Sequence, residues 1–119
     1  QGIFNRLRVR APSLETLIVN LSGGNQQKVV LGKSLLAKPQ ILLIDEPTKG
    51  IDVGAKTEIY KLMNELVESG VSIIMVSSDM PELVSMSDRC IVLSNSHITG
   101  EFTGSDITQD NVMRAAIAQ

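Results

Sequence analysis

A serine followed by two glycines and an asparagine, Ser22 to Asn25, precedes a stretch rich in helix-forming residues. The start of a helix leaves its first N–H groups unpaired and carries about half a positive charge, so it can bind an anion. Gly23 and Gly24 would let a phosphate approach the backbone without meeting a Cβ atom, and Ser22 adds a hydroxyl. The run therefore predicts a phosphate site; the alternative is an N-cap serine followed by a flexible pair.

Two acids, Asp45 and Glu46, close the wholly apolar run Ile41 to Ile44. An acid at the carboxyl end of a buried strand can hold Mg²⁺, usually through water, and a second acid beside it can polarise an attacking water. In this interpretation Asp45 serves the metal and Glu46 serves the water. The alternative is that both acids are solvated loop residues.

The elements that must position these residues alternate between helix and strand. A helix is expected over residues 25–38, because the stretch is rich in helix formers and ends at Pro39. Three of its apolar residues are available for burial: Val29, Leu35 and Leu36. The run 41–44 suits a strand covered on both faces, and such strands are typical of parallel sheets.

The same alternation continues to the end of the sequence. A second helix has one apolar stripe and ends at Gly70; its stripe consists of Ile59, Leu62, Met63, Leu66 and Val67. A strand over 71–76 precedes a short helix through about Met86 that Asp79 caps. The last elements are a strand over 90–94, a turn at Asn95 and Ser96, a strand over 97–102, and a helix from Thr108 to about Ala118. The fold class is therefore α/β, a mostly parallel sheet with flanking helices.

Composition excludes several other classes of protein. The 119 residues have a formal charge of -2 and no Trp, which favours neither a nucleic-acid surface nor a stacking platform for single strands. The single cysteine, Cys90, cannot form an internal disulfide and is expected to be a small core residue. The only histidine, His97, is expected on a solvated strand. Apolar runs are too short to span a membrane, so a soluble protein is expected.

Three motifs together resemble the ABC-type ATPases. Leu21 to Lys28 resembles their signature motif, and Ile41 to Thr48 resembles their Walker B strand, with Asp45 placed 23 residues after Ser22. Gly50-Ile51-Asp52 resembles the D-loop, although Asp52 alone would be assigned to a helix start. The resemblance implies that ATP and Mg²⁺ are bound. It assigns Asp45 to the metal, Glu46 to catalysis, and Ser22, Gly23, Gly24, Asn25 and Asp52 to nucleotide binding.

One position departs from the family pattern. Most ABC ATPases place a histidine that contacts the γ-phosphate after the strand that follows Walker B, and here that position is Ser78. A serine hydroxyl donates one hydrogen bond but has neither the reach nor the charge of an imidazole. Ser78 is therefore a degenerate switch residue, and we expect weakened hydrolysis at the site that contains Glu46.

The particular forms of these motifs resemble the second cassette of bacterial monosaccharide importers of the ribose, galactose and xylose type. The runs 22–28, 48–56 and 77–82 carry this finer likeness. It implies a peripheral position on the cytoplasmic face of the inner membrane. It also implies as partners the first cassette of the same polypeptide, transmembrane permease subunits and, indirectly, a periplasmic sugar-binding protein.

The sequence contains no G-x-x-x-x-G-K-[ST] run, the loop that supplies most of the hold on ATP. The resemblance therefore implies a partial P-loop fold, the C-terminal fragment of one ABC ATPase domain over 1–119. Residues 1–20 form a peripheral segment, and residues 21–119 carry the motifs, the hairpin and the last helix. The signature motif would act in trans on ATP of the other cassette, and the isolated fragment is expected to be inactive.

The missing strand has a structural consequence. In the family it lies between the strand ending at Val76 and the one over 90–94, so its removal would leave apolar side chains such as Ile74 and Val92 partly uncovered. Either the last strand closes the gap, or two chains self-associate or exchange elements.

Two alternative functions stay open. The first is a non-catalytic ABC-like regulatory or assembly module, supported by Ser78 and the missing loop. The second is the C-terminal half of a chromosome or repair-type ABC ATPase, which requires heptads upstream; residues 1–20 show none.

Overall fold

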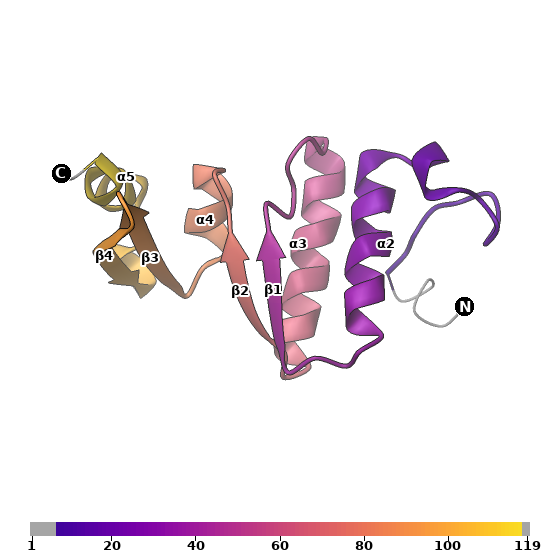
Figure 1. Ribbon diagram of the computed structural model, residues 1–119, viewed down its shortest axis with the longest axis horizontal. Coiled ribbons are helices and arrows are strands. Elements are labelled where there is room, and N and C mark those ends of the chain that lie inside the picture. The colour runs from indigo at the N-terminus through magenta and orange to yellow at the C-terminus, as the bar shows by residue number, and fades with distance from the viewer. Residues whose placement is uncertain (1–6, 118–119) are drawn as a thin grey trace. The chain divides into compact units, whose positions relative to one another are not determined.

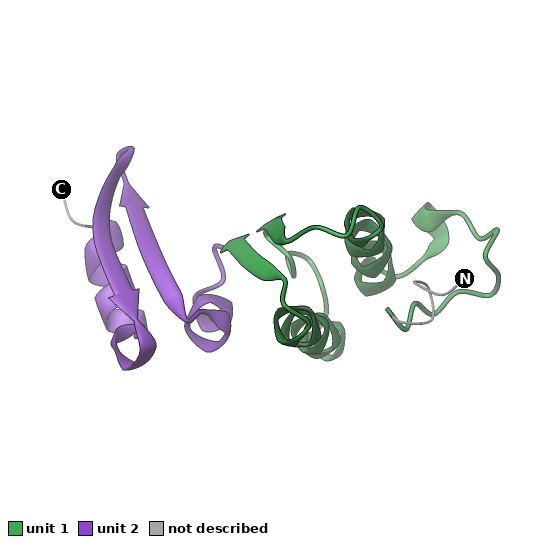
Figure 2. Cartoon of the chain, turned by 90° about the horizontal axis from the view of Figure 1, so that it is seen from below, with its two compact units in different colours: residues 1–76 green, residues 77–119 purple. Residues whose placement is uncertain are grey.

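A computed structural model describes residues 7–117, which divide into two compact units (Figures 1 and 2). The first unit is Gln1–Val76 and the second is Ser77–Gln119. Within residues 7–117, no helix combines the length and the apolar character needed to cross a bilayer.

In its described residues, 7–76, the first unit contains two strands, two α-helices and a short 3₁₀ turn. In chain order they are η1 (Ile18–Asn20), α2 (Gly23–Leu35), β1 (Ile41–Asp45), α3 (Val53–Glu68) and β2 (Ser72–Val76). The strands β1 and β2 are parallel, with Ile41 opposite Ser72 and Asp45 opposite Val76, so the predicted parallel pairing is confirmed. Figure 1 shows α2 and α3 side by side next to these strands.

The core of the first unit lies between the helices and one face of the β1–β2 pair. Its buried members are Leu7, Leu31, Leu42, Leu62 and Leu66. The inward face of the sheet also contributes Ile44 and Ile73, which are partly buried against this cluster.

The other face of the sheet is exposed, so the expectation of a strand covered on both faces is wrong for β1. Ile41 and Leu43 expose 60% and 74% of their surface, because the described helices of this unit cover only the opposite face. Ile74, which is paired with Leu43, is 56% exposed, as predicted for a sheet that lacks neighbours.

Helix boundaries follow local signals. Gly70 has a φ of +97° just after α3, a left-handed conformation that glycine adopts without strain, so the predicted helix end is confirmed. The helix α2 begins two residues earlier than predicted, at Gly23. Its buried apolar residue is Leu31, whereas Leu36 is 67% exposed, so the prediction that Leu36 is buried is wrong.

Over residues 77–117 the second unit is a β-hairpin with two α-helices and a short 3₁₀ turn. It comprises α4 (Met80–Met86), β3 (Arg89–Ser94), β4 (His97–Thr103), a 3₁₀ turn η2 (Gly104–Asp106) and α5 (Gln109–Ile117). The strands β3 and β4 are antiparallel. Asn95 and Ser96 join them with φ values of 48° and 64°, the two left-handed residues of a type I′ turn, so the predicted hairpin is confirmed.

The core of this unit forms where α5 packs on the hairpin. Cys90 and Val92 are buried there together with Ile107, Val112 and Ala115. Cys90 is thus a core residue as predicted, and burial raises the pKa of its thiol. The prediction that Val92 is partly uncovered is wrong: it is 7% exposed because its side chain joins the cluster that α5 covers.

Each sheet in the described residues has two strands, β1–β2 and β3–β4. The expectation that the last strand closes the gap left by the missing strand is therefore wrong, since among the described strands β4 pairs with β3 alone. Exchange of elements between two chains stays a prediction.

Candidate functional site

A pocket of about 310 Å³ lies at the N-terminal ends of α2 and α3, within the first unit. Four of its lining residues are among the predicted nucleotide-binding residues: Ser22, Gly24, Asn25 and Asp52. Three charged residues that the sequence analysis did not assign also line it: Arg10, Lys28 and Glu58. Folding therefore brings the signature-like run and the D-loop-like run together.

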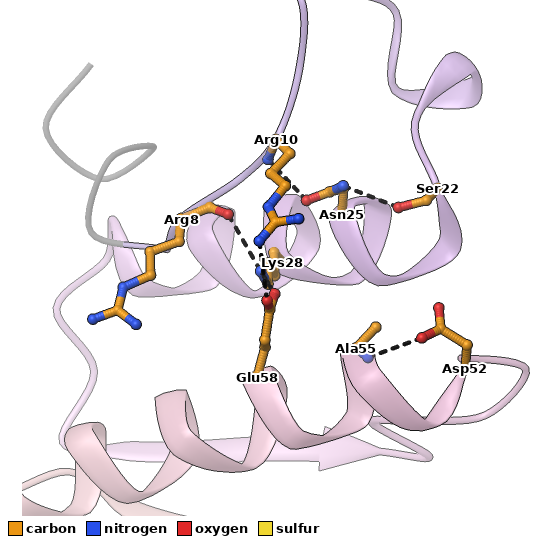
Figure 3. A network of polar contacts seen from close by, with 8 residues as sticks. All are labelled: Arg8, Arg10, Ser22, Asn25, Lys28, Asp52, Ala55 and Glu58. Atoms are coloured by element: carbon orange, nitrogen blue, oxygen red, sulfur yellow. Dashed lines mark hydrogen bonds and ion pairs between the residues drawn. The ribbon is translucent and has the colours of Figure 1, made fainter.

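Ser22 occupies the N-cap position of α2, yet its side chain makes no capping hydrogen bond to the described helix. Instead the Asn25 Nδ2 group donates to Ser22 Oγ over 2.9 Å, and the Arg10 backbone N–H donates to Asn25 Oδ1 over 2.9 Å (Figure 3). An Oγ atom that accepts from Asn25 still has its own hydrogen to donate. Asn25 thus orients the Ser22 hydroxyl, which is exposed at the pocket.

The two glycines meet different surroundings. A Cβ atom on Gly24 would lie 2.6 Å from the Ala55 Cβ atom, so the close approach of α2 to α3 requires glycine there. A Cβ atom on Gly23 would meet only the Gly50 carbonyl oxygen, at an ordinary 3.8 Å. The contacts of the described chain therefore account for Gly24 but not for Gly23.

Asp52 caps α3: its Oδ1 atom accepts a hydrogen bond of 3.0 Å from the Ala55 backbone N–H. The helix-start interpretation of Asp52 thus matches the geometry. Its carboxylate is also exposed and lines the pocket opposite the start of α2 (Figure 3).

Lys28 and Glu58 form an ion pair between α2 and α3 that sequence reasoning missed. The Lys28 side chain is 3% exposed, and its ammonium donates to the Glu58 carboxylate and, over 3.3 Å, to the Arg8 carbonyl oxygen. Hydrogen bonding and charge attraction from Lys28 lower the pKa of Glu58, with smaller contributions from Arg10 and Arg8. The available signal was spacing, since Lys28 follows Gly24 by four residues and Glu58 follows Ala55 by three.

The two acids at the end of β1, Asp45 and Glu46, do not line this pocket. Asp45 is the last residue of β1 and is exposed at its carboxyl end. Glu46 follows with a φ of 49°, and its N–H donates to the Val76 carbonyl oxygen over 2.8 Å. A left-handed backbone at a non-glycine residue fixes the direction in which the chain leaves the strand.

The donor set near Asp45 is too small for a protein-only metal site. Within residues 7–117, no three His, Cys, Asp or Glu side chains gather closely enough to hold a metal ion. A single carboxylate does fit Mg²⁺ that arrives with a phosphate, because Mg²⁺ usually keeps several waters and takes one or two carboxylates.

Ser78 lies in the second unit and is exposed, directly before the Asp79 that caps α4. Its neighbour Ser77 donates to the carboxylate of Glu82, which is 1% exposed, and accepts from the Asp79 N–H over 3.0 Å. This buried cluster was not predicted. It fixes the chain on both sides of Ser78.

Comparisons with known proteins identify relatives. The ABC transporter family profile matches residues 3–49. The xylose import ATP-binding protein XylG of Moorella thermoacetica is 55% identical over 112 residues, which are 94% of this chain and 22% of that protein. The galactose/methyl galactoside import ATP-binding protein MglA of Clostridium perfringens is 57% identical over 95% of this chain and 22% of that protein. The ribose import ATP-binding protein RbsA 1 of Rubrobacter xylanophilus is 55% identical over 98% of this chain and 23% of that protein.

Solved structures share the fold. A nucleotide-free ATP-binding cassette from an ABC transporter superposes with a TM-score of 0.86 at 21% identity, over 99% of this chain and 48% of that one. A cassette bound to ADP and Pi superposes with a TM-score of 0.75 at 25% identity, over 86% of this chain and 44% of that one. The predicted α/β fold, a partial ABC cassette, is confirmed.

The chain spans 22–23% of the length of these import proteins, and half or less of the solved cassettes. Within that span the identity exceeds half of the residues, and the matching stretch includes the signature-like run at the start of α2. The chain is thus similar to ABC transporters over residues 3–49, and over almost its whole length to the ATP-binding proteins for xylose, galactose and ribose import.

Proposed function

We propose that the chain is part of the ATP-binding subunit of a bacterial ABC sugar importer, which couples ATP binding and hydrolysis to carbohydrate uptake. The pocket at the start of α2 would contact a nucleotide held by another cassette. The observation that carries this proposal is the arrangement around Ser22. Its hydroxyl, oriented by Asn25, lies at an exposed helix start beside Gly23, where the chain leaves room for a ligand.

The residues of this chain would act on the phosphates by donating hydrogen bonds. The Ser22 hydroxyl lies at the start of α2, where the first N–H groups of a helix are unpaired and the helix dipole favours an anion. The Gly23 backbone could approach a phosphate closely because no side chain intervenes. Mg·ATP would supply the phosphoanhydride bond whose hydrolysis drives transport.

Asp45 and Glu46 would serve a second nucleotide site. Asp45 would hold Mg²⁺ through water, and Glu46 would orient the attacking water. Ser78, at the switch position, would give this second site only a weak contact to the γ-phosphate, so the chief contribution of the chain would be made at Ser22.

The proposed partners and location of the chain are inferred from its similarity to the import proteins. The partners would be the first cassette of the same polypeptide, transmembrane permease subunits and, indirectly, a periplasmic sugar-binding protein. The position would be peripheral, on the cytoplasmic face of the inner membrane. Selection of the sugar would belong to the binding protein and the channel.

A non-catalytic regulatory or assembly module is the second candidate. Ser78, in place of histidine at the switch position, favours it. The chromosome or repair-type ATPase has less support, since the relatives described above are import proteins.

A segment graft tests the proposal. The matching 112-residue stretch of the Moorella XylG protein would be replaced by this sequence, and ATP hydrolysis by the chimera measured. Ser22→Arg adds bulk and charge at the pocket and should lower kcat by about 100-fold or more, whereas Glu46→Gln should matter less. The control is Ser105→Arg, at an exposed serine of η2, which should have no effect.

The opposite ranking overturns the assignment. If Glu46→Gln were the more damaging change, the active site would be the one at β1. Calorimetry on the isolated 119-residue chain gives an independent check: tight binding of Mg·ATP by the chain alone would contradict a role in trans.

A further inference from the structure

The contact between α2 and α3 has two fixed points about one helical turn apart. The first is the close approach of Gly24 to Ala55, where a Cβ atom would clash at 2.6 Å. The second is the ion pair of Lys28 with Glu58. A single point of contact would let one helix pivot on the other; two points fix their separation and their rotation.

The ion pair is built to hold a position. A lysine that is 3% exposed gives up its hydration, and the cost is large unless the ammonium is paired and hydrogen-bonded. Lys28 meets this requirement with the Glu58 carboxylate and the Arg8 carbonyl oxygen. Buried and partnered on two sides, it is far less mobile than an exposed lysine.

A second connection runs from the same segment to the pocket. The Arg10 backbone N–H donates to Asn25 Oδ1, and the Arg10 guanidinium lies 3.7 Å from the Glu58 carboxylate (Figure 3). Asn25 in turn donates to Ser22 Oγ. The segment that contains Arg8 and Arg10 is therefore tied both to the ion pair and to the Ser22 hydroxyl.

Ser22 and Asp52 are the N-cap residues of the two helices that this network joins. Any rotation of α2 against α3 moves the Ser22 hydroxyl relative to the Asp52 carboxylate. The two groups come from separate motifs in the sequence, and the packing of α2 on α3 brings them together.

We infer that Lys28 and Glu58 are positioning residues that hold Ser22 and Asp52 as one preformed surface for a phosphate-bearing ligand. This inference rests on the proposed function, since it assumes that the surface contacts a nucleotide. Because the phosphate-binding loop of another cassette would supply most of the hold on ATP, a misplaced surface should lower kcat far more than it raises KM.

The test uses the XylG chimera and four variants. Lys28→Met keeps the apolar stem but removes the charge, and Glu58→Gln keeps the shape of the acceptor. Each should lower kcat by about 10-fold to 100-fold with KM for ATP changed less than about threefold. Lys28→Arg retains the charge and should recover most of the loss. The control is Arg114→Met, which breaks an exposed ion pair with Asp110 on α5 and should change nothing.

Hydrogen exchange on the 119-residue chain, without nucleotide, reports whether the starts of α2 and α3 stay in place. The reporters are amides held at the two helix starts: Gln26, bonded to the Ser22 carbonyl oxygen, and Ala55, bonded to the Asp52 side chain. In Lys28→Met and Glu58→Gln their exchange should accelerate by about 10-fold, while amides in β3 stay unchanged.

The outcomes separate the two proposals. If Ser22→Arg is harmless in the chimera, the proposed function fails, and the exchange data alone decide whether Lys28 and Glu58 fix the helix starts. If Ser22→Arg is damaging but Lys28→Met and Glu58→Gln leave kcat unchanged, the positioning role is overturned. Equal losses in kcat and in the amount of folded protein by circular dichroism would also overturn it, in favour of a purely structural pair.

Discussion

A Cβ atom on Gly24 would lie only 2.6 Å from the Cβ atom of Ala55, so α2 and α3 meet with almost no side chain between their backbones. Gly23 precedes it, and a Cβ atom there would have free space, with only the Gly50 carbonyl oxygen 3.8 Å away. Helix packing therefore requires glycine at position 24, whereas no contact within the described chain requires it at position 23.

This difference predicts unequal costs of adding a methyl group. Gly24→Ala should lower the free energy of unfolding by about 1–3 kcal/mol, because it overpacks the helix contact. Gly23→Ala should change it by less than about 0.5 kcal/mol. Urea denaturation of the chain measures both. Gly24→Ala combined with Ala55→Gly should recover part of the loss; a double variant as unstable as the sum of its parts would contradict the contact.

Acid should weaken the first unit through Glu58. Lys28, Arg10 and Arg8 face this carboxylate and lower its pKa in the folded state, so the unfolded state binds the proton more readily. The stabilisation is fully present above the unfolded pKa of about 4.3 and is lost as the pH falls through the lower folded pKa. Urea titrations between about pH 6 and pH 3 should show a steeper loss of stability for the parent than for Glu58→Gln. Parallel curves would contradict the assignment.

Cys90 should react only when the second unit opens. The thiol is buried, and burial raises its pKa, so little thiolate is present at neutral pH. Modification by an aromatic disulfide reagent should be about 100-fold slower in buffer than in denaturing urea. A rate in buffer close to that of a free thiol would show that α5 does not cover the hairpin in solution.

The exposed face of the β1–β2 pair should make the isolated chain self-associate. Leu43 and Ile74 are paired on this face and are 74% and 56% exposed. Contiguous exposed apolar side chains on a sheet favour contact between molecules. Sedimentation velocity should detect dimers or larger species at micromolar concentration, and Leu43→Glu should shift the distribution toward monomer.

The matched control is Val19→Glu, at a valine that is 72% exposed but lies in the 3₁₀ turn η1. It should leave the distribution unchanged. A parent chain that sediments as a monomer would contradict the prediction.

Local patterns in the sequence predicted most of the elements. The apolar runs became β1 and β2 in parallel, Gly70 ends α3, and the Asn95-Ser96 turn forms the hairpin. Each of these depends on neighbours within a few residues, where conformational preference and periodicity act directly.

Burial was harder to predict, because it depends on what lies across from a residue. Leu31 is buried and Leu36 is exposed, although both are apolar residues in or next to the same helix. Val92 is covered by α5, which is distant along the chain, whereas Leu43 has no covering layer among the described elements of its unit. Composition gives the amount of apolar surface but does not show which apolar side chains pack against one another.

The candidate site divides in the same way. Motif spacing identified Ser22, Asn25 and Asp52, which the fold brings to one pocket. The Lys28–Glu58 pair was missed, because spacing places each residue on a helix face but does not show that the two faces, thirty residues apart in the sequence, meet. A lysine in a helix is usually solvated, and this one is buried because its ammonium pairs with Glu58 of α3 and bonds the Arg8 carbonyl oxygen.

The open position at Gly23 also offers a way to obstruct this surface without disturbing the fold. A bulky label attached through Gly23→Cys, in a chain with Cys90→Ala, would meet little of its own molecule. It would fill the space in front of the start of α2, so a labelled chain would separate loss of docking from loss of folding.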